Sequence, residues 1–127
     1  MNRLAWRCGR WIWGHVPFGG SIAVAGGGPI GLLLIQLLRA AGVSRIVTIE
    51  PLAHRREAAF RWGADEVVTP RDDISGYGAD VAFELAWNND AVRMAFESVR
   101  PGERVVLGGI PDSDTTTFRA SLARRRG

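Results

Sequence analysis

The sequence predicts an α/β domain built on a parallel sheet of about five strands, with helices on both faces. From Ser21 onward, short unbroken apolar runs alternate with longer stretches of helical periodicity. The first run, 21–25, is apolar on both sides, as expected of a central parallel strand that is buried on both faces. The chain has 127 residues, 46% hydrophobic and 23% charged, which indicates one ordered globular domain.

The first strand–helix–strand unit is expected directly after residue 20. Pro29 suits the first turn of its helix, because the N–H that proline lacks would have no helical partner there. Gly42 is placed to end the same helix. The predicted elements are a strand at 21–25, a helix at 29–41 and a strand at 45–50.

Two further strand–helix units follow the same alternation. Gly63 is expected to close the second helix, and Pro101 with Gly102 marks a turn after the third. A polar loop separates the third and fourth strands, and the tail after Pro111 is polar and then basic. The predicted elements are a helix at 53–62, a strand at 66–69, a strand at 80–85, a helix at 90–99 and a strand at 104–108.

The two ends of the chain do not complete this pattern. Residues 1–20 hold three of the five tryptophans, at positions 6, 11 and 13, which indicates either a segment that meets a partner surface or a coding artefact. At the other end no sixth strand follows, so the fifth strand is expected at an edge of the sheet. The predicted organisation is a segment of unclear role at 1–20 and an incomplete domain at 21–127.

A membrane-spanning or secreted protein is not expected. Residues 11–38 contain no Asp, Glu, Lys or Arg, and arginines at 3, 7 and 10 precede them, which superficially resembles a signal or spanning segment. However, Pro17, Pro29 and the glycines at 19, 20, 26, 27 and 28 interrupt the stretch, and each would destabilise a continuous helix.

The charge pattern argues against nucleic acid as a partner. The net charge is +3, and all 16 basic residues are arginines scattered along the chain rather than gathered in a stripe. Such usage fits GC-rich coding better than selection for binding a polyanion. The single cysteine, Cys8, excludes an internal disulfide and cannot form a zinc cluster alone, so a cytoplasmic setting fits best.

Three glycines between the first strand and the first helix carry the strongest motif. Gly26, Gly28 and Gly31 satisfy GxGxxG. Gly26 permits a tight turn, Gly28 lets the backbone approach a pyrophosphate, and Gly31 lets the helix pack closely on the sheet. The N–H groups at the helix start then face the phosphates. This predicts the phosphate-binding turn of a Rossmann dinucleotide-binding domain; a glycine-rich turn that binds nothing is the alternative.

A carboxylate at the expected distance supports the same interpretation. Glu50 ends the second strand, 19 residues after Gly31, where it is placed to accept hydrogen bonds from the adenosine ribose and to repel a 2'-phosphate. NAD is therefore favoured over NADP, although Arg55 and Arg56 nearby would soften the preference. The alternative for Glu50 is a solvated carboxylate at a strand end, and His54 is interpreted as a surface residue.

Beyond these motifs the chain carries a family resemblance. Its ordered segments are SIAVAGGGPIGLLLIQLLRAAGVSRIVTIEPLAHRREAAFRWGADEVV, GADVAFE and VRPGERVVLGGIPDSDTTTF. They resemble the coenzyme-binding domain of the zinc-type medium-chain dehydrogenase/reductases, in the style of sorbitol, iditol, alcohol and threonine dehydrogenases, over residues 21 to about 126.

The resemblance implies a set of contacts to NAD(H). It places Glu50 and Arg55 beside the adenosine ribose. The pyrophosphate would be held by Gly26, Gly28, Pro29, Ile30 and Gly31, and the nicotinamide end would lie beside Gly108, Gly109 and Ile110.

Two departures limit what the resemblance implies. Trp87 stands where such enzymes usually have glycine, so it either crowds the cofactor's path or marks a shifted loop. The domain that binds catalytic zinc in the family is absent, and Cys8, His15 and His54 have no metal-ligand spacing. The expected function is thus the NAD-binding part of an alcohol or polyol dehydrogenase, without catalytic or metal-binding residues of its own. Its expected partners are a missing catalytic domain or a second copy; the alternative is a non-catalytic dinucleotide-binding module or sensor subunit.

Overall fold

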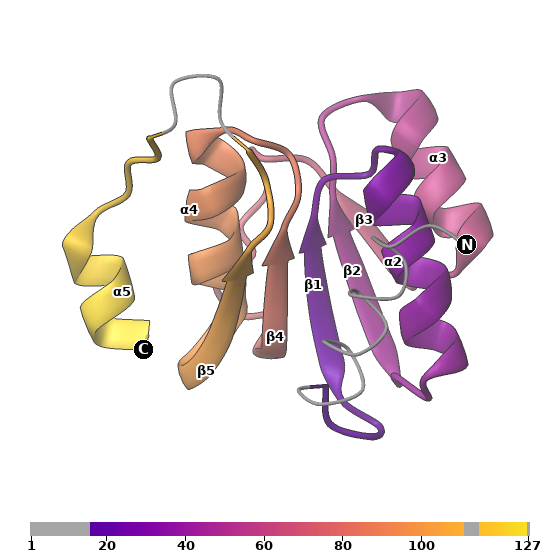
Figure 1. The fold of residues 1–127 in the computed structure, drawn as a ribbon, viewed down its shortest axis with the longest axis horizontal. Helices are drawn as coiled ribbons and strands as arrows, with labels where there is room; N and C mark the ends of the chain where they lie inside the picture. The colour runs from indigo at the N-terminus through magenta and orange to yellow at the C-terminus, as the bar shows by residue number, and fades with distance from the viewer. Residues whose placement is uncertain (1–15, 111–114, 127) are drawn as a thin grey trace.

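The computed structural model describes residues 16–110 and 115–126, and it confirms the predicted α/β fold (Figure 1). Within these residues five parallel strands form one sheet in the order β3-β2-β1-β4-β5. The elements are β1 (Ser21–Ala25), α2 (Pro29–Ala40), β2 (Arg45–Ile49), α3 (Ala53–Trp62), β3 (Glu66–Val68), β4 (Ala79–Glu84), α4 (Asn89–Ser98), β5 (Val99–Leu107) and α5 (Ala120–Arg126).

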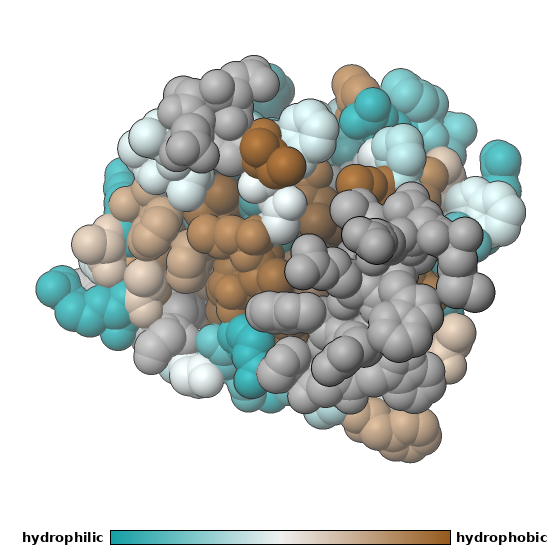
Figure 2. Space-filling model, in the orientation of Figure 1, coloured by the Kyte–Doolittle hydropathy of each residue, from teal (hydrophilic) through white to brown (hydrophobic). Residues whose placement is uncertain are grey.

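Helices cover both faces of the sheet. α2 and α3 lie on the face toward the viewer in Figure 1, where Ile35 and Leu38 of α2 pack with Ile22 of β1. α4 lies behind the sheet, where Met94 packs against Ala23 in a second buried cluster. Figure 2 shows apolar residues gathered in the middle of the front face, with hydrophilic residues along its rims. β1, β2 and β4 are therefore central strands that are buried from both sides.

The helix ends agree with the local sequence signals. Gly28 is the N-cap of α2 and Pro29 its first residue, while Gly42 follows the helix with φ of 84°. α3 spans the predicted residues and ends at Gly63, whose φ is 130°. These two glycines occupy backbone conformations that other residues rarely adopt, which explains why both helices end where they do.

The last third of the chain differs from the prediction in two places. β5 already begins at Val99, which pairs with Ala79, and the turn residues Pro101 and Gly102 interrupt the ladder before Arg104 pairs with Val81. The short helix α5 was not predicted, because its residues show no clear apolar period; α5 packs against β5 and α4. β5 is an edge strand of the described sheet, as expected.

Several predictions concern residues that the structure does not describe. The tryptophans at 6, 11 and 13, together with Cys8 and His15, lie outside the described residues, so the interpretation of the 1–20 segment stays a prediction. No helix within the described ranges combines the length and apolar character needed to cross a bilayer.

Tyr77, the only tyrosine of the chain, yields a prediction for alkaline pH. Its hydroxyl donates to the Ile22 carbonyl at 3.3 Å, Arg45 lies 4.2 Å from its ring centroid, and burial raises the pKa of the phenol above its usual value of 10.0. Because the folded-state pKa is raised, the neutral phenol stabilises the fold below the unfolded-state pKa, and this stability is lost as pH rises through the folded-state pKa. Tyrosinate absorbance should therefore appear only above pH 10, together with unfolding, and Tyr77→Phe should flatten the pH dependence of unfolding in that range. A tyrosinate signal at the ordinary pKa in the folded chain would contradict this.

Candidate functional site

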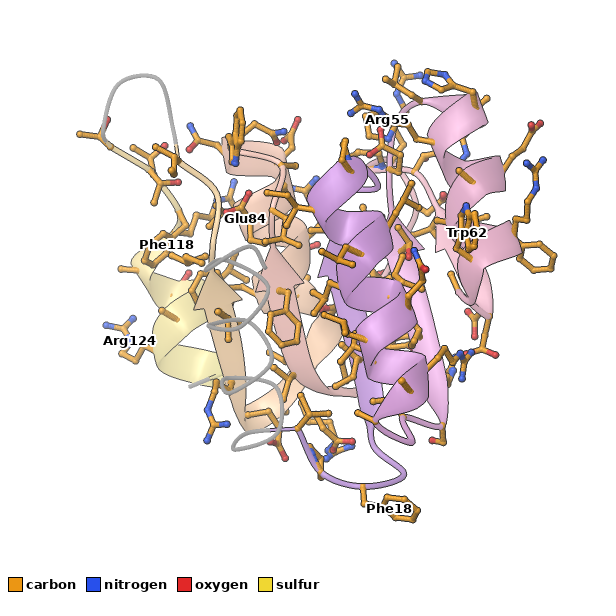
Figure 3. The ribbon with its side chains drawn as sticks, turned by 45° about the vertical axis from the view of Figure 1, so that its right-hand side comes forward. Phe18, Arg55, Trp62, Glu84, Phe118 and Arg124 are labelled. Carbon is orange, nitrogen blue, oxygen red and sulfur yellow. The ribbon has the colours of Figure 1, made fainter. Side chains whose placement is uncertain are left out.

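The candidate site lies at the edge of the sheet to which all the strands point. β1 is flanked by β2 and β4, and the chain leaves β1 toward one face, whereas it leaves β4 toward the other. Ligands of open α/β sheets bind at such a switch point, beyond the carboxyl ends of the strands. In Figure 3 both Arg55 and Glu84 lie at this edge, while Phe18 lies at the opposite one.

The glycine turn after β1 is shaped by contacts that exclude side chains. Gly26 has φ of 122°, and its N–H donates to the Ile49 carbonyl at 2.9 Å. A Cβ on Gly31 would lie 2.0 Å from the carbonyl oxygen of Gly26, which is far inside van der Waals contact. A Cβ on Gly26 would crowd the backbone after β4, at 3.1 Å from Leu85. Gly26 and Gly31 are thus required by the close approach of turn, helix and sheet.

The start of α2 presents backbone N–H groups to the open side of the turn. Within the described residues, the N–H groups of Gly28, Ile30 and Gly31 have no acceptor, and Pro29 has no N–H. No acidic residue stands in the first turn of α2 and no side chain caps it. A Cβ on Gly28 would meet only the Arg55 guanidinium, at 3.7 Å, so space is left beside the backbone. Unpaired N–H groups at the positive end of a helix form an anion site, and they fit the phosphates of a dinucleotide.

Glu50 is buried beside this turn. The residue is 3% exposed; its carboxylate accepts from the N–H of Gly27 at 2.7 Å and from the N–H of Leu52 at 3.1 Å. The alternative of a solvated carboxylate is therefore wrong. Sequence reasoning missed Gly27, where a Cβ would lie 3.2 Å from the Glu50 Cγ. The run of three glycines was its only signal, since GxGxxG leaves that position open.

Two neighbouring arginines of α3 differ in the contacts that their side chains make. Arg56 donates to the carbonyls of Glu50 and Pro51, at 2.9 and 2.7 Å, and so holds the segment after β2. Arg55 is exposed near Gly28, and its guanidinium has no hydrogen-bond or ion-pair partner among the described residues. Arg55 is thus a free cation beside the turn. His54 is exposed on α3, as expected.

A second buried carboxylate lies at the end of β4. Glu84 is 2% exposed and accepts from the N–H groups of Ala86 and Trp87, at 2.8 and 2.7 Å, and from Gly109 at 3.3 Å. The Glu84 carbonyl also accepts from Gly108 at 2.8 Å. Glu84 therefore joins the segments that follow β4 and β5. Its sequence signal was a lone acid that ends an apolar strand, as Glu50 also does.

The predicted site residues thus form two adjoining groups. The turn residues, Glu50 and Arg55 surround the end of β1, while Gly108 and Gly109 lie beside Glu84; Ile110 follows with 74% exposure. The groups meet where Leu85 donates its N–H to the Ala25 carbonyl at 2.8 Å. Trp87 has φ of 64°, a conformation that favours glycine.

Comparison with known proteins places this fold in a family. Residues 29–126 match the family described as zinc-binding dehydrogenase. The chain belongs to the zinc-binding dehydrogenase family. The L-threonine 3-dehydrogenase of Caldanaerobacter subterraneus subsp. tengcongensis is 40% identical over 105 residues, which are 76% of this chain and 30% of that protein. The sorbitol dehydrogenase of Bacillus subtilis is 34% identical over 107 residues, again 76% of this chain and 30% of the relative.

Solved dehydrogenase structures share the fold. A zinc-binding dehydrogenase from Sinorhizobium meliloti, bound to NADP, superimposes with a TM-score of 0.79 at 28% identity, over 96% of this chain and 39% of that one. The alcohol dehydrogenase TADH from Thermus sp. ATN1 gives 0.77 at 29% identity, over 95% and 38%. The chain spans about 30% of the length of the curated relatives it matches.

The zinc of the family name finds no ligand set in the described part of this dehydrogenase domain. No group of three or more His, Cys, Asp or Glu side chains that would suit a metal ion occurs within 16–110 and 115–126. A protein zinc site takes three or four such ligands. These residues therefore do not fit zinc.

Proposed function

We propose that this chain is the NAD-binding part of a dehydrogenase that oxidises a secondary alcohol or polyol. The observation that carries the proposal is the pairing of Glu50 with Gly27, at 2.7 Å, directly beside the unpaired N–H groups that begin α2. A pyrophosphate on those N–H groups would bring the adjoining ribose to the Glu50 carboxylate. When bound, NAD accepts the hydride; the protein's part is to hold and orient it.

NAD is proposed over NADP because the Glu50 carboxylate is immobile. Two backbone donors hold it beside the phosphate turn, and a carboxylate so held would retain lone pairs for two ribose hydroxyl groups. A 2'-phosphate at the same place would meet a buried negative charge, which costs more than an exposed one. Arg55 is proposed to attract the cofactor's phosphates rather than to select NADP, since it lies beside Gly28 at the phosphate turn.

Catalysis is proposed to need residues beyond those described. The family name implies zinc, which the described residues do not fit. The proposal therefore includes a partner that supplies the catalytic residues, either a separate catalytic domain or a second copy of the chain. The proposed location is the cytoplasm. The absence of a fitting ligand set in the described ranges also favours a second candidate, a dinucleotide-binding module without turnover of its own.

Calorimetric titration of the full chain with NAD, NADH and NADPH tests the proposal. We expect binding of NAD and NADH, and NADPH binding at least about tenfold weaker, equivalent to about 1.4 kcal/mol. A folded chain that binds neither NAD nor NADH would refute the function. Alcohol oxidation by the chain alone would refute the assignment of catalysis to residues outside it.

Arg55→Ala is expected to weaken NADH binding about three- to tenfold, because one favourable contact between a free guanidinium and the phosphates is lost. The salt dependence of the dissociation constant should fall as well, since fewer ionic contacts form. Arg61→Ala is the matched control, because Arg61 is exposed on the last turn of the same helix, away from the phosphate turn. Equal effects of the two variants would show that Arg55 acts only through the net charge of the protein.

A further inference from the structure

Trp87 combines three properties that the fold itself does not require. Its backbone has φ of 64°, which makes it the only residue other than glycine with positive φ in the described part of the chain. The residue as a whole is 56% exposed. It stands three residues after the end of β4, at the edge of the sheet where the candidate site lies. A strained backbone conformation at the edge where ligands bind points to a role of this residue in binding.

The surroundings of Trp87 hold the indole in place. Glu84 accepts from the Trp87 N–H at 2.7 Å, which keeps the positive φ. On the next residue, Asn88 caps α4 by accepting from the Ala91 N–H at 2.8 Å. A Cβ on Gly109 would lie 2.5 Å from the indole Cδ1, so the ring lies directly against the Gly109 backbone. The exposed ring is thus presented from a turn that is fixed on both sides.

The indole also lines a hollow at the same edge. A pocket of about 200 Å³ is formed between α4, the end of β5 and the segment before α5, with Trp87, Leu107, Gly109 and Thr116 among its walls. Thr116 is held there by its hydroxyl, which donates to Asn89 at 3.2 Å. The walls of this hollow are both apolar and polar, and the buried Glu84 is one of them.

The direction of the bound dinucleotide follows from the sheet order. Glu50 follows β2 and the phosphate turn follows β1, so a dinucleotide whose adenosine ribose lies at Glu50 continues past β1 toward β4 and β5. Trp87 lies on that path. We propose that the Trp87 indole is a wall of the site for the nicotinamide half, packing against its apolar and aromatic surface; this rests on the function proposed above.

Tryptophan fluorescence tests the placement directly, since reduced nicotinamide accepts energy from a nearby indole. The full chain and its variants Trp87→Phe, Trp87→Gly and Trp62→Phe are titrated with NADH, with binding measured in parallel by calorimetry. Trp62 is the matched control, because it is exposed to a similar degree but stands at the last turn of α3 (Figure 3). Trp87→Gly suits the positive φ, so it keeps the test valid if Trp87→Phe fails to fold.

We expect both Trp87 variants to lose the larger part of the sensitised nicotinamide emission, whereas Trp62→Phe keeps it. Trp87→Gly should also bind NADH about three- to tenfold more weakly, because an aromatic contact is lost. NADH affinity and sensitised emission that are unchanged in both Trp87 variants would overturn the proposal, and so would tighter binding by Trp87→Gly, which would show that the indole obstructs the cofactor. If the unaltered chain does not bind NADH at all, the function proposed above fails and this inference fails with it.

Discussion

Gly31→Ala is expected to lower the free energy of unfolding by at least about 2 kcal/mol and to weaken NADH binding at least about tenfold. The added methyl group would lie 2.0 Å from the Gly26 carbonyl oxygen and 3.0 Å from its carbon, both in the backbone. Neither atom can move away as a side chain would, so the turn and α2 must separate. In an unconstrained helix the same substitution would gain about 1 kcal/mol, so a net loss identifies the clash.

Urea denaturation and NADH calorimetry of Gly31→Ala measure the two effects. Gly76→Ala is the control, because Gly76 is exposed and a Cβ there would meet nothing within 4 Å. Its stability should stay within about 1 kcal/mol of the unaltered chain. If Gly31→Ala were as stable as Gly76→Ala and bound NADH normally, the close contact between Gly31 and Gly26 would be wrong.

Glu50→Ala is expected to weaken NAD binding about ten- to a hundredfold, because two hydrogen bonds from ribose hydroxyls to a charged group are lost. The ratio of NADP to NAD affinity should rise at the same time, since the repulsion of the 2'-phosphate is removed. The free energy of unfolding should fall by roughly 2 to 4 kcal/mol, because the N–H groups of Gly27 and Leu52 lose their acceptor.

Glu57→Ala and Glu50→Gln separate these effects. Glu57 is exposed on α3, so its removal should change neither stability nor cofactor preference. Glu50→Gln keeps one acceptor oxygen, and it should recover part of the stability while still admitting NADP better than the unaltered chain does. An unchanged preference between NAD and NADP in Glu50→Ala would refute the role proposed for this carboxylate.

The fold and the phosphate turn were predictable from the sequence because their signals are local. The strand at Ser21–Ala25 and the helix at Ala53–Trp62 are found at the predicted bounds, since apolar period and flanking glycines act over a few residues. The GxGxxG motif and Glu50 were predictable for the same reason, because their spacing along the chain is the signal. α5 was missed because its residues show no clear apolar period. It packs on α4 and β5, and Phe118, two residues before it, contacts Phe96 of α4 at 4.8 Å between ring centroids, so this short helix depends on tertiary packing.

The sequence by itself therefore determined the order of strands and helices, the glycine turn and the acid at the end of β2. Only the tertiary structure decided which backbone N–H groups the two carboxylates bind. The Glu50 carboxylate accepts a hydrogen bond from Gly27, 23 residues away. The Glu84 carboxylate accepts from Trp87 and also from Gly109, which is 25 residues after Glu84. Such bonds depend on parallel strands that end at one edge of the sheet, a juxtaposition that no spacing along the chain encodes. For the same reason the buried state of both carboxylates, and the placing of the exposed Trp87 indole against Gly109, follow from the packing of distant segments.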